Sequence, residues 1–166
     1  LMYGWDAAAP NAWEILDGRL RVEDDGASDL FYAQYKDDFS DATIEADLRQ
    51  LQGATSGFSP AYGLIVRSKA DDNEFYEFDI AIDGYYSIVK MENAGGPNFV
   101  DWVYRETVLA DWTYSRAINP GQGRWNTLKV VCQANKLRFF INDVEVELLS
   151  DDSYCSGKVG LIARYG

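Results

Sequence analysis

The sequence contains no histidine, and only two cysteines and four prolines among its 166 residues. Without histidine the chain cannot form a Ser-His-Asp or Cys-His pair, a histidine-ligated zinc site or an imidazole general base. Any catalysis would therefore rest on carboxylates, tyrosine or lysine. The chain also lacks an apolar run of about 18 residues, the length that spans a membrane as a helix. We expect no insertion into a membrane.

Positive charge is scarce as well, with 15 Lys and Arg against 27 Asp and Glu and a formal net charge of −12. A surface of this sign repels nucleic-acid phosphates and anionic lipids, so nucleic acid is not an expected partner. With 47% hydrophobic residues the chain can bury a sizeable core. We predict a single domain over residues 1–166. Because the sequence begins Leu1-Met2, we expect it to be a segment of a longer protein with further domains.

Apolar residues recur at every second position, with turn-forming residues about every ten positions. In residues 42–49, for example, Ile44, Ala46 and Leu48 alternate with charged residues. No segment shows a helical pattern. The predicted strands are 19–22, 30–35, 42–49, 62–67, 75–82, 85–90, 127–134, 137–141, 144–148 and 158–164. Two packed antiparallel sheets bury the apolar faces of so many short strands, which predicts an all-β sandwich.

Turn chemistry then sets the expected registers. Asp83-Gly84 predicts a two-residue turn, which places Phe78 opposite Val89 and Glu77 opposite Lys90. Glu77 then lies on a solvated outer face.

Two further turns are predicted near the C-terminus, at Asn135-Lys136 and Asn142-Asp143. They place Phe139 opposite Cys132 and Val146, so that these three side chains face the core.

Several phrases carry a family resemblance through their order and spacing: Trp13-Glu14-Ile15-Leu16-Asp17-Gly18-Arg19-Leu20, Tyr62-Gly63-Leu64-Ile65-Val66-Arg67, Asn73-Glu74-Phe75-Tyr76-Glu77-Phe78, Gly84-Tyr85-Tyr86-Ser87-Ile88-Val89-Lys90, Trp125-Asn126-Thr127-Leu128-Lys129-Val130, Phe139-Phe140-Ile141-Asn142-Asp143 and Ser156-Gly157-Lys158-Val159-Gly160-Leu161. From about residue 13 to 162, the chain resembles the concanavalin A-like lectin/glucanase superfamily. More narrowly, it is similar to laminin-G-like bacterial jelly-roll domains related to fructan-binding modules and the keto-disaccharide hydrolase family.

The resemblance implies a jelly-roll β-sandwich that is extracellular or at the cell surface. It also implies a glycan or polysaccharide ligand on the concave sheet. One departure is the final apolar strand of such domains, which does not follow Val159-Gly160-Leu161. Either the sequence stops before it, or residues 3–6 take its place.

Paired carboxylates at Glu77 and Asp79 are similar to those of jelly-roll glucanases, where acidic residues alternate along one strand. A retaining glycosidase needs two carboxyl groups about 5–5.5 Å apart, with the strand supplying a third acidic residue. Ala81 and Ile82 occupy the places of that third residue. The alternative is a solvated strand face, and we favour a non-catalytic domain.

The predicted ligand site consists of Arg67, Glu77, Asp79, Tyr86, Lys90 and Trp102. In the predicted registers the strand residues of this set share the outer face. The charged members would hydrogen-bond sugar hydroxyls and the two aromatic residues would stack on the ring. An ion-paired sheet surface is the open alternative. Trp112 and Trp125 are expected in the core.

Acidic clusters occur in predicted turns, at Asp24-Asp25, Asp37-Asp38 with Asp41, Asp71-Asp72 and Asp151-Asp152. None has the spacing of a dedicated calcium loop, so solvated turns are favoured over a structural calcium site, which stays open.

Cys132 and Cys155 are equally compatible with a disulfide and with two free thiols.

Three functions follow from these observations. We favour a non-catalytic carbohydrate-binding or adhesion module. The alternatives are a glycoside or keto-sugar hydrolase on the same fold, and a structural, protein-binding domain of a surface protein.

Overall fold

The computed structural model describes residues 4–7, 12–23, 30–53, 60–69, 74–93 and 104–164. All regular structure in these ranges is β-strand, as the period-two pattern predicts, and they contain no helix that is long and apolar enough to cross a membrane. The strands are β1 (Trp5–Ala7), β2 (Trp13–Leu16), β3 (Arg19–Val22), β4 (Leu30–Tyr35), β5 (Ala42–Leu48), β6 (Ala61–Ser68), β7 (Phe75–Ala81), β8 (Tyr85–Asn93), β9 (Tyr104–Tyr114), β10 (Asn126–Gln133), β11 (Lys136–Ile141), β12 (Val144–Ser150) and β13 (Lys158–Arg164).

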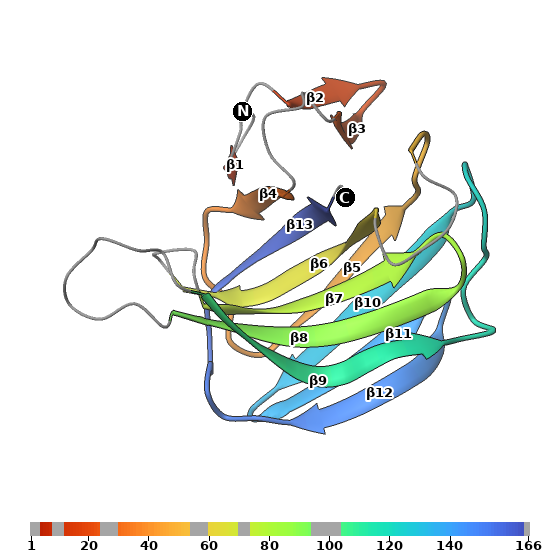
Figure 1. Ribbon diagram of the computed structural model, residues 1–166. Helices are drawn as coiled ribbons and strands as arrows, with labels where there is room; N and C mark the ends of the chain where they lie inside the picture. Colours follow the sequence, from red (N-terminus) through yellow and green to blue (C-terminus); the bar gives the residue numbers. More distant parts are fainter. Residues whose placement is uncertain are drawn as a thin grey trace.

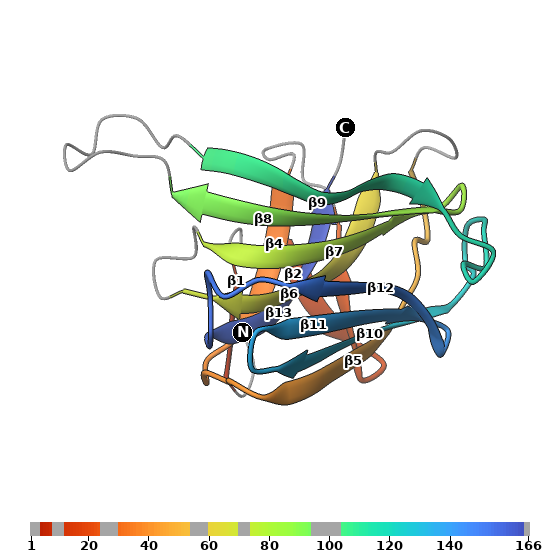
Figure 2. The ribbon, with the colours of Figure 1, turned by 90° about the horizontal axis from the view of Figure 1, so that it is seen from below.

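Two antiparallel sheets pack face to face (Figures 1 and 2). The larger has seven strands in the order β1-β4-β13-β6-β7-β8-β9, and the smaller has four in the order β12-β11-β10-β5. The hairpin β2–β3 packs on the side of the seven-stranded sheet that faces the smaller sheet, where Trp13 and Val22 form a cluster with Phe31 of β4. The register across β4, β13, β6 and β7 puts Phe31 on the same side as Ile80 of the core. The N-terminal segment, one of the two alternatives for the place of the missing final strand, contributes the edge strand β1, beside β4. We call the face of the seven-stranded sheet that points away from the smaller sheet the outer face.

The core lies between the sheets and follows the alternation along each strand. On β7, Tyr76, Phe78 and Ile80 point into it, and all three are fully buried. Phe78 meets Phe139 of β11 in an edge-to-face contact, with the ring centroids 5.2 Å apart. Since burying one such side chain contributes about 1.5–3 kcal/mol, these inward rows account for most of the drive to form the sandwich.

The register of the β7–β8 hairpin differs from the predicted one by a single residue. The turn has three residues, 82–84, with Gly84 at a φ of +100°. Glu77 therefore lies opposite Val89, and Tyr76 lies opposite Lys90. Because side chains alternate with period two, this slip moves Lys90 from the outer face to the inner side of the sheet. The Asp-Gly pair favours a two-residue turn, but a three-residue turn with glycine in the left-handed region is the next most common solution.

The hairpins near the C-terminus agree better with the prediction. The turn at Asn142-Asp143 is confirmed, although a bulge before it places Phe139 opposite Glu147 rather than Val146. The preceding turn lies at Ala134-Asn135, one residue earlier than predicted, so Phe139 pairs with Val130. This changes the pairing by two positions and leaves the same side chains in the core.

The structure also corrects the predictions for two aromatic residues. Trp125 is 39% exposed and lies against the guanidinium groups of Arg49 and Arg19, 4.4 Å and 5.2 Å from its ring centroid. Trp125 was expected in the core, but it lies outside the sandwich and stacks with two cationic side chains. Trp112 is half-buried on β9 rather than in the core.

Of the two cysteine hypotheses, the free thiols are found: Cys132 is buried and Cys155 is exposed, and neither forms a disulfide.

Candidate functional site

A charged cluster occupies the outer face of the seven-stranded sheet. Because Tyr76, Phe78 and Ile80 fill the core, the alternation along β7 turns Glu77 and Asp79 outward, as predicted. The predicted solvation of these two carboxylates is wrong, since they are only 1% and 3% exposed.

Arg164, at the end of β13, binds Glu77 through two hydrogen bonds. Its Nε and Nη2 atoms donate to Oε1 and Oε2 of Glu77 over 2.5 Å and 2.6 Å. Nε also lies 3.6 Å from Oδ2 of Asp79. A planar guanidinium matches a carboxylate in this two-pronged geometry, so Arg164 fixes the position of Glu77 and neutralises its charge.

The second carboxyl group, that of Asp79, has a shifted pKa. Burial raises the pKa of Asp79 well above its usual range, and the adjacent Glu77 carboxylate raises it further, while Arg164 opposes the shift. The Oδ1 atom of Asp79 has no hydrogen-bond partner within the described residues. The site therefore combines a carboxylate held by two hydrogen bonds from Arg164 with a neighbouring carboxyl group whose pKa is raised.

Gly63 on β6 makes room for Asp79. A Cβ atom at this position would lie 2.6 Å from Oδ1 of Asp79 and would clash with the carbonyl oxygen of Phe78. Only glycine at position 63 leaves room for the Asp79 carboxyl group to pack against the backbone of β6.

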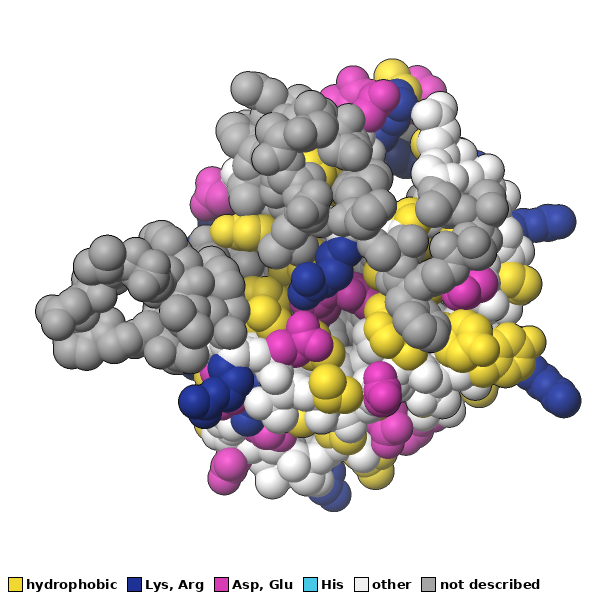
Figure 3. All heavy atoms as spheres, in the orientation of Figure 1, with side chains coloured by type: hydrophobic (Ala, Val, Ile, Leu, Met, Phe, Trp, Pro, Cys, Tyr) yellow, Lys and Arg dark blue, Asp and Glu magenta, His cyan; other side chains and the backbone are white. Residues whose placement is uncertain are grey.

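Aromatic and acidic side chains of β8 and β9 lie on the same face of the sheet as the cluster. Tyr85 of β8 and Tyr114 of β9 lie opposite each other and make an edge-to-face contact at 5.6 Å, and Tyr114 is 59% exposed. Trp112 lies two positions before Tyr114, so the alternation along β9 places it on this side as well. Glu106 of β9 is exposed and acts electrostatically on Asp79. Figure 3 shows acidic and basic side chains together near the middle of the molecule, with hydrophobic side chains on both sides.

The structure does not bring the six predicted ligand residues to one face. Glu77 and Asp79 lie on the outer face, whereas Tyr86 and Lys90 point to the inner side because of the hairpin register. Tyr86 is 5% exposed, and its hydroxyl donates to the carbonyl oxygen of Val146 in the smaller sheet. Trp102 lies outside the described residues.

Arg67 is also turned inward, by a bulge in the β13–β6 pairing. Its φ of +56° departs from the extended conformation that the alternation assumes. The side chain is 1% exposed and donates to the carbonyl oxygens of Tyr154 and Ala134, over 2.9 Å and 2.6 Å. No regular pattern in the sequence signals this bulge. The prediction that Arg67 shares a surface with Glu77 is therefore wrong.

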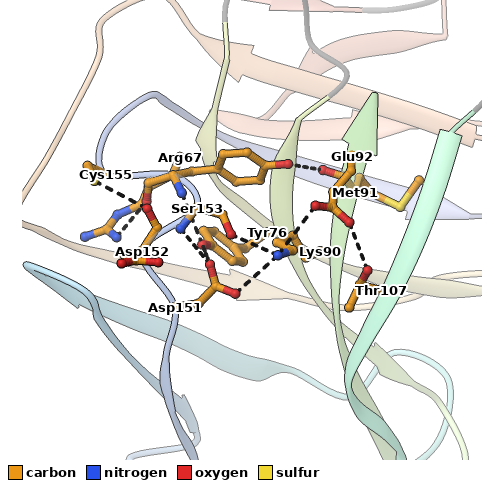
Figure 4. Close-up of polar contacts among 11 residues, drawn as sticks. Arg67, Tyr76, Lys90, Met91, Glu92, Thr107, Asp151, Asp152, Ser153 and Cys155 are labelled. Atoms are coloured by element: carbon orange, nitrogen blue, oxygen red, sulfur yellow. Dashed lines mark hydrogen bonds and ion pairs between the residues drawn. The ribbon is translucent and has the colours of Figure 1, made fainter. Parts of the chain in front are cut away.

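Lys90 belongs to a polar network that joins β8 to the segment after β12 (Figure 4). Its Nζ atom contacts Asp151 at 3.3 Å and Ser153 at 2.9 Å, and the hydroxyl of Tyr76 donates to Asp151 over 2.6 Å. Although partial burial alone would raise the pKa of Asp151, hydrogen bonds from Ser153, Tyr76 and Lys90 hold it far below the usual range. This internal network ties the two sheets together.

The acidic turns show structural uses for two of their members. Asp151 belongs to the network above, and Asp41 accepts a hydrogen bond from the backbone N–H of Ala134. Among the described residues there is no group of three acidic, cysteine or histidine side chains that could hold a metal ion. Asp24-Asp25 and Asp71-Asp72 lie outside those residues.

Comparison with known proteins gives the family. Residues 2–163 match the family model of the 3-keto-alpha-glucoside-1,2-lyase-like domain, so the chain belongs to this family. It has the concanavalin A-like jelly-roll fold predicted from the sequence. No curated protein matches significantly.

Solved structures of the same fold include both binding modules and enzymes. The carbohydrate-binding module CBM66 from Bacillus subtilis superposes with a TM-score of 0.76 at 19% identity, over 98% of this chain and 89% of that one. A β-1,3-1,4-glucanase (lichenase) from a mouse hindgut metagenome gives 0.64 at 15% identity, covering 98% and 80%. The Bacillus licheniformis β-glucanase gives 0.58 at 8% identity, also covering 98% and 80%.

Proposed function

We propose that this chain is a non-catalytic carbohydrate-binding domain that holds a glycan on the outer face of the seven-stranded sheet. The observation that carries the proposal is the buried Glu77–Arg164 pair in the middle of a sheet face. Charged groups are expensive to bury, and a sheet face that needed only stability would be better served by apolar side chains. The similarity in fold to a carbohydrate-binding module supports the same conclusion.

The chemistry of the cluster suits a sugar. Sugar hydroxyl groups accept hydrogen bonds, and the Arg164 side chain, 32% exposed, has N–H groups beyond the two that donate to Glu77. Tyr114, exposed on the same face, supplies a flat apolar surface for a sugar of the same glycan. Glu106, also exposed on β9, adds a further acceptor.

A second candidate is hydrolysis or elimination of a glycoside or keto-sugar. It is favoured by the raised pKa of Asp79, which lies beside Glu77 on the same face of β7. A carboxyl group that keeps its proton can serve as an acid. Against it, both oxygens of Glu77 are occupied by Arg164, and Ala81 stands at the next outward position of β7. We therefore rank binding first.

The test is a glycan array followed by calorimetric titration of the best ligand. Tyr114→Ala and Arg164→Lys should each weaken binding about tenfold, because an aromatic or guanidinium contact to a ligand is worth about 1.4 kcal/mol or more at the centre of a site. Trp125→Ala removes an exposed aromatic residue outside the site and is the matched control, expected to bind normally. Unchanged affinity in both site variants would disprove the assigned surface.

The enzymatic candidate has its own assay. Concentrated protein would be incubated with β-glucans and with 3-keto-disaccharides, and released sugar would be measured. Turnover that Asp79→Asn abolishes would establish the second candidate. The extracellular location, the further domains of the parent protein and the single-domain boundary of 1–166 stay predictions.

A further inference from the structure

The charge of the outer-face cluster is unbalanced. The charges of Glu77 and, more weakly, Glu106 raise the pKa of Asp79, and the charge of Arg164 lowers it. Arg164 donates two hydrogen bonds to Glu77, so its positive charge is balanced by that carboxylate. Whether or not Asp79 is protonated, the cluster therefore keeps an excess of negative charge.

Glu106 is the part of this excess that a ligand can reach. It is exposed on β9, opposite Met91, and no ion pair within the described residues neutralises it. The pairing of Met91 with both Phe75 and Glu106 places Glu106 two strands from β7, on the same face as Glu77 and Asp79. An exposed carboxylate without an ion-pair partner is best satisfied by a cationic donor.

From this arrangement, and resting on the proposed function, we propose that the site selects glycans carrying protonated amino groups, such as glucosamine units with free amines, over neutral glycans. Glycans carrying carboxylate or sulfate groups are excluded. A sugar ammonium beside Glu106 gains an ion pair, whereas a uronate meets a like charge. The net charge of −12 strengthens the preference by drawing cationic ligands to the surface.

The experiment measures binding to four oligosaccharides of one length and linkage: the β-1,4-glucosamine oligomer, its N-acetylated form, the glucose oligomer and the glucuronate oligomer. Titrations are made at a pH where the amines are protonated, in low and high salt. Glu106→Gln removes one charge at the exposed edge of the cluster. Glu45→Gln makes the same change at an exposed position of β5 in the other sheet and is the matched control.

We expect the glucosamine oligomer to bind about fivefold more tightly than its N-acetylated form, the upper range for a solvent-exposed ion pair. Glu106→Gln and high salt should remove this preference, and Glu45→Gln should keep it. Equal binding of the neutral and cationic oligomers would overturn the inference while leaving the proposed function intact. Loss of the preference in both variants would also overturn it, by showing attraction to the whole acidic surface. If no oligosaccharide binds, both the inference and the proposed function fail.

Discussion

Replacing Arg164 by methionine tests the central pair directly. Methionine keeps much of the side-chain volume but leaves Glu77, which is 1% exposed, without its partner. Breaking a buried ion pair from one side costs about 3–5 kcal/mol, because the remaining charge is unpaired. Arg164 itself is about one-third exposed, so water partly screens the pair and we expect the lower end, about 3 kcal/mol. A domain of ordinary stability, about 5–15 kcal/mol, would still fold.

The assay is urea unfolding followed by tryptophan fluorescence, with Glu77→Gln and the double variant completing a cycle. The double variant should recover most of the loss, since a neutral amide needs no cation. A loss below about 1 kcal/mol, or the same loss in the Glu77→Gln background, would refute the reasoning.

Three further outcomes follow from the same structure. The raised pKa of Asp79 means that the folded state binds this proton more tightly than the unfolded chain does, so the carboxyl group costs stability as the pH rises above about 4. Asp79→Asn should therefore gain in melting temperature over the wild type as the pH rises from about 4 to neutral, and a constant difference would argue against the shift. The lowered pKa of Asp151 stabilises the folded state at neutral pH, and this contribution is lost as the pH falls. Asp151→Asn should therefore lower the free energy of unfolding by about 1–3 kcal/mol at neutral pH and by progressively less in acid. An equal loss at all pH values in urea titrations would count against the network. Gly63→Ala should lower the free energy of unfolding by about 1–3 kcal/mol, because the added methyl group clashes with the Phe78 carbonyl oxygen. If the variant is as stable as the wild type, the two strands are less closely packed there.

Much of the fold could be predicted from the sequence because alternation is a local signal. The inward rows of β7, β10 and β11 are fixed by their apolar residues, and an error of one residue in a turn position was harmless where it changed the pairing by two. The turn after β7 was different, since one extra turn residue reversed the faces of Tyr86 and Lys90. Both a two-residue and a three-residue turn fit Ile82-Asp83-Gly84, and tertiary packing decides between them.

The candidate site was predicted only in part for related reasons. Glu77 and Asp79 were identified because they alternate with apolar residues on one strand. The burial of these two carboxyl groups could not be predicted, because it depends on the neighbouring strands and on Arg164, which lies 87 positions after Glu77 in the chain. The alternation of Ile162 and Arg164 in the last strand was an available signal, but it does not reveal which strand β13 pairs with. The bulge at Arg67 leaves no such trace.

The measurement that tests the account most directly is a titration of isotope-labelled protein with the best ligand from the glycan array, followed by backbone amide chemical shifts. The account predicts that the shifts change on the outer face, around Glu77, Ser87 and Glu106, and stay constant on β10 and β11 of the smaller sheet. Changes confined to the smaller sheet, or an array on which no glycan binds, would contradict it.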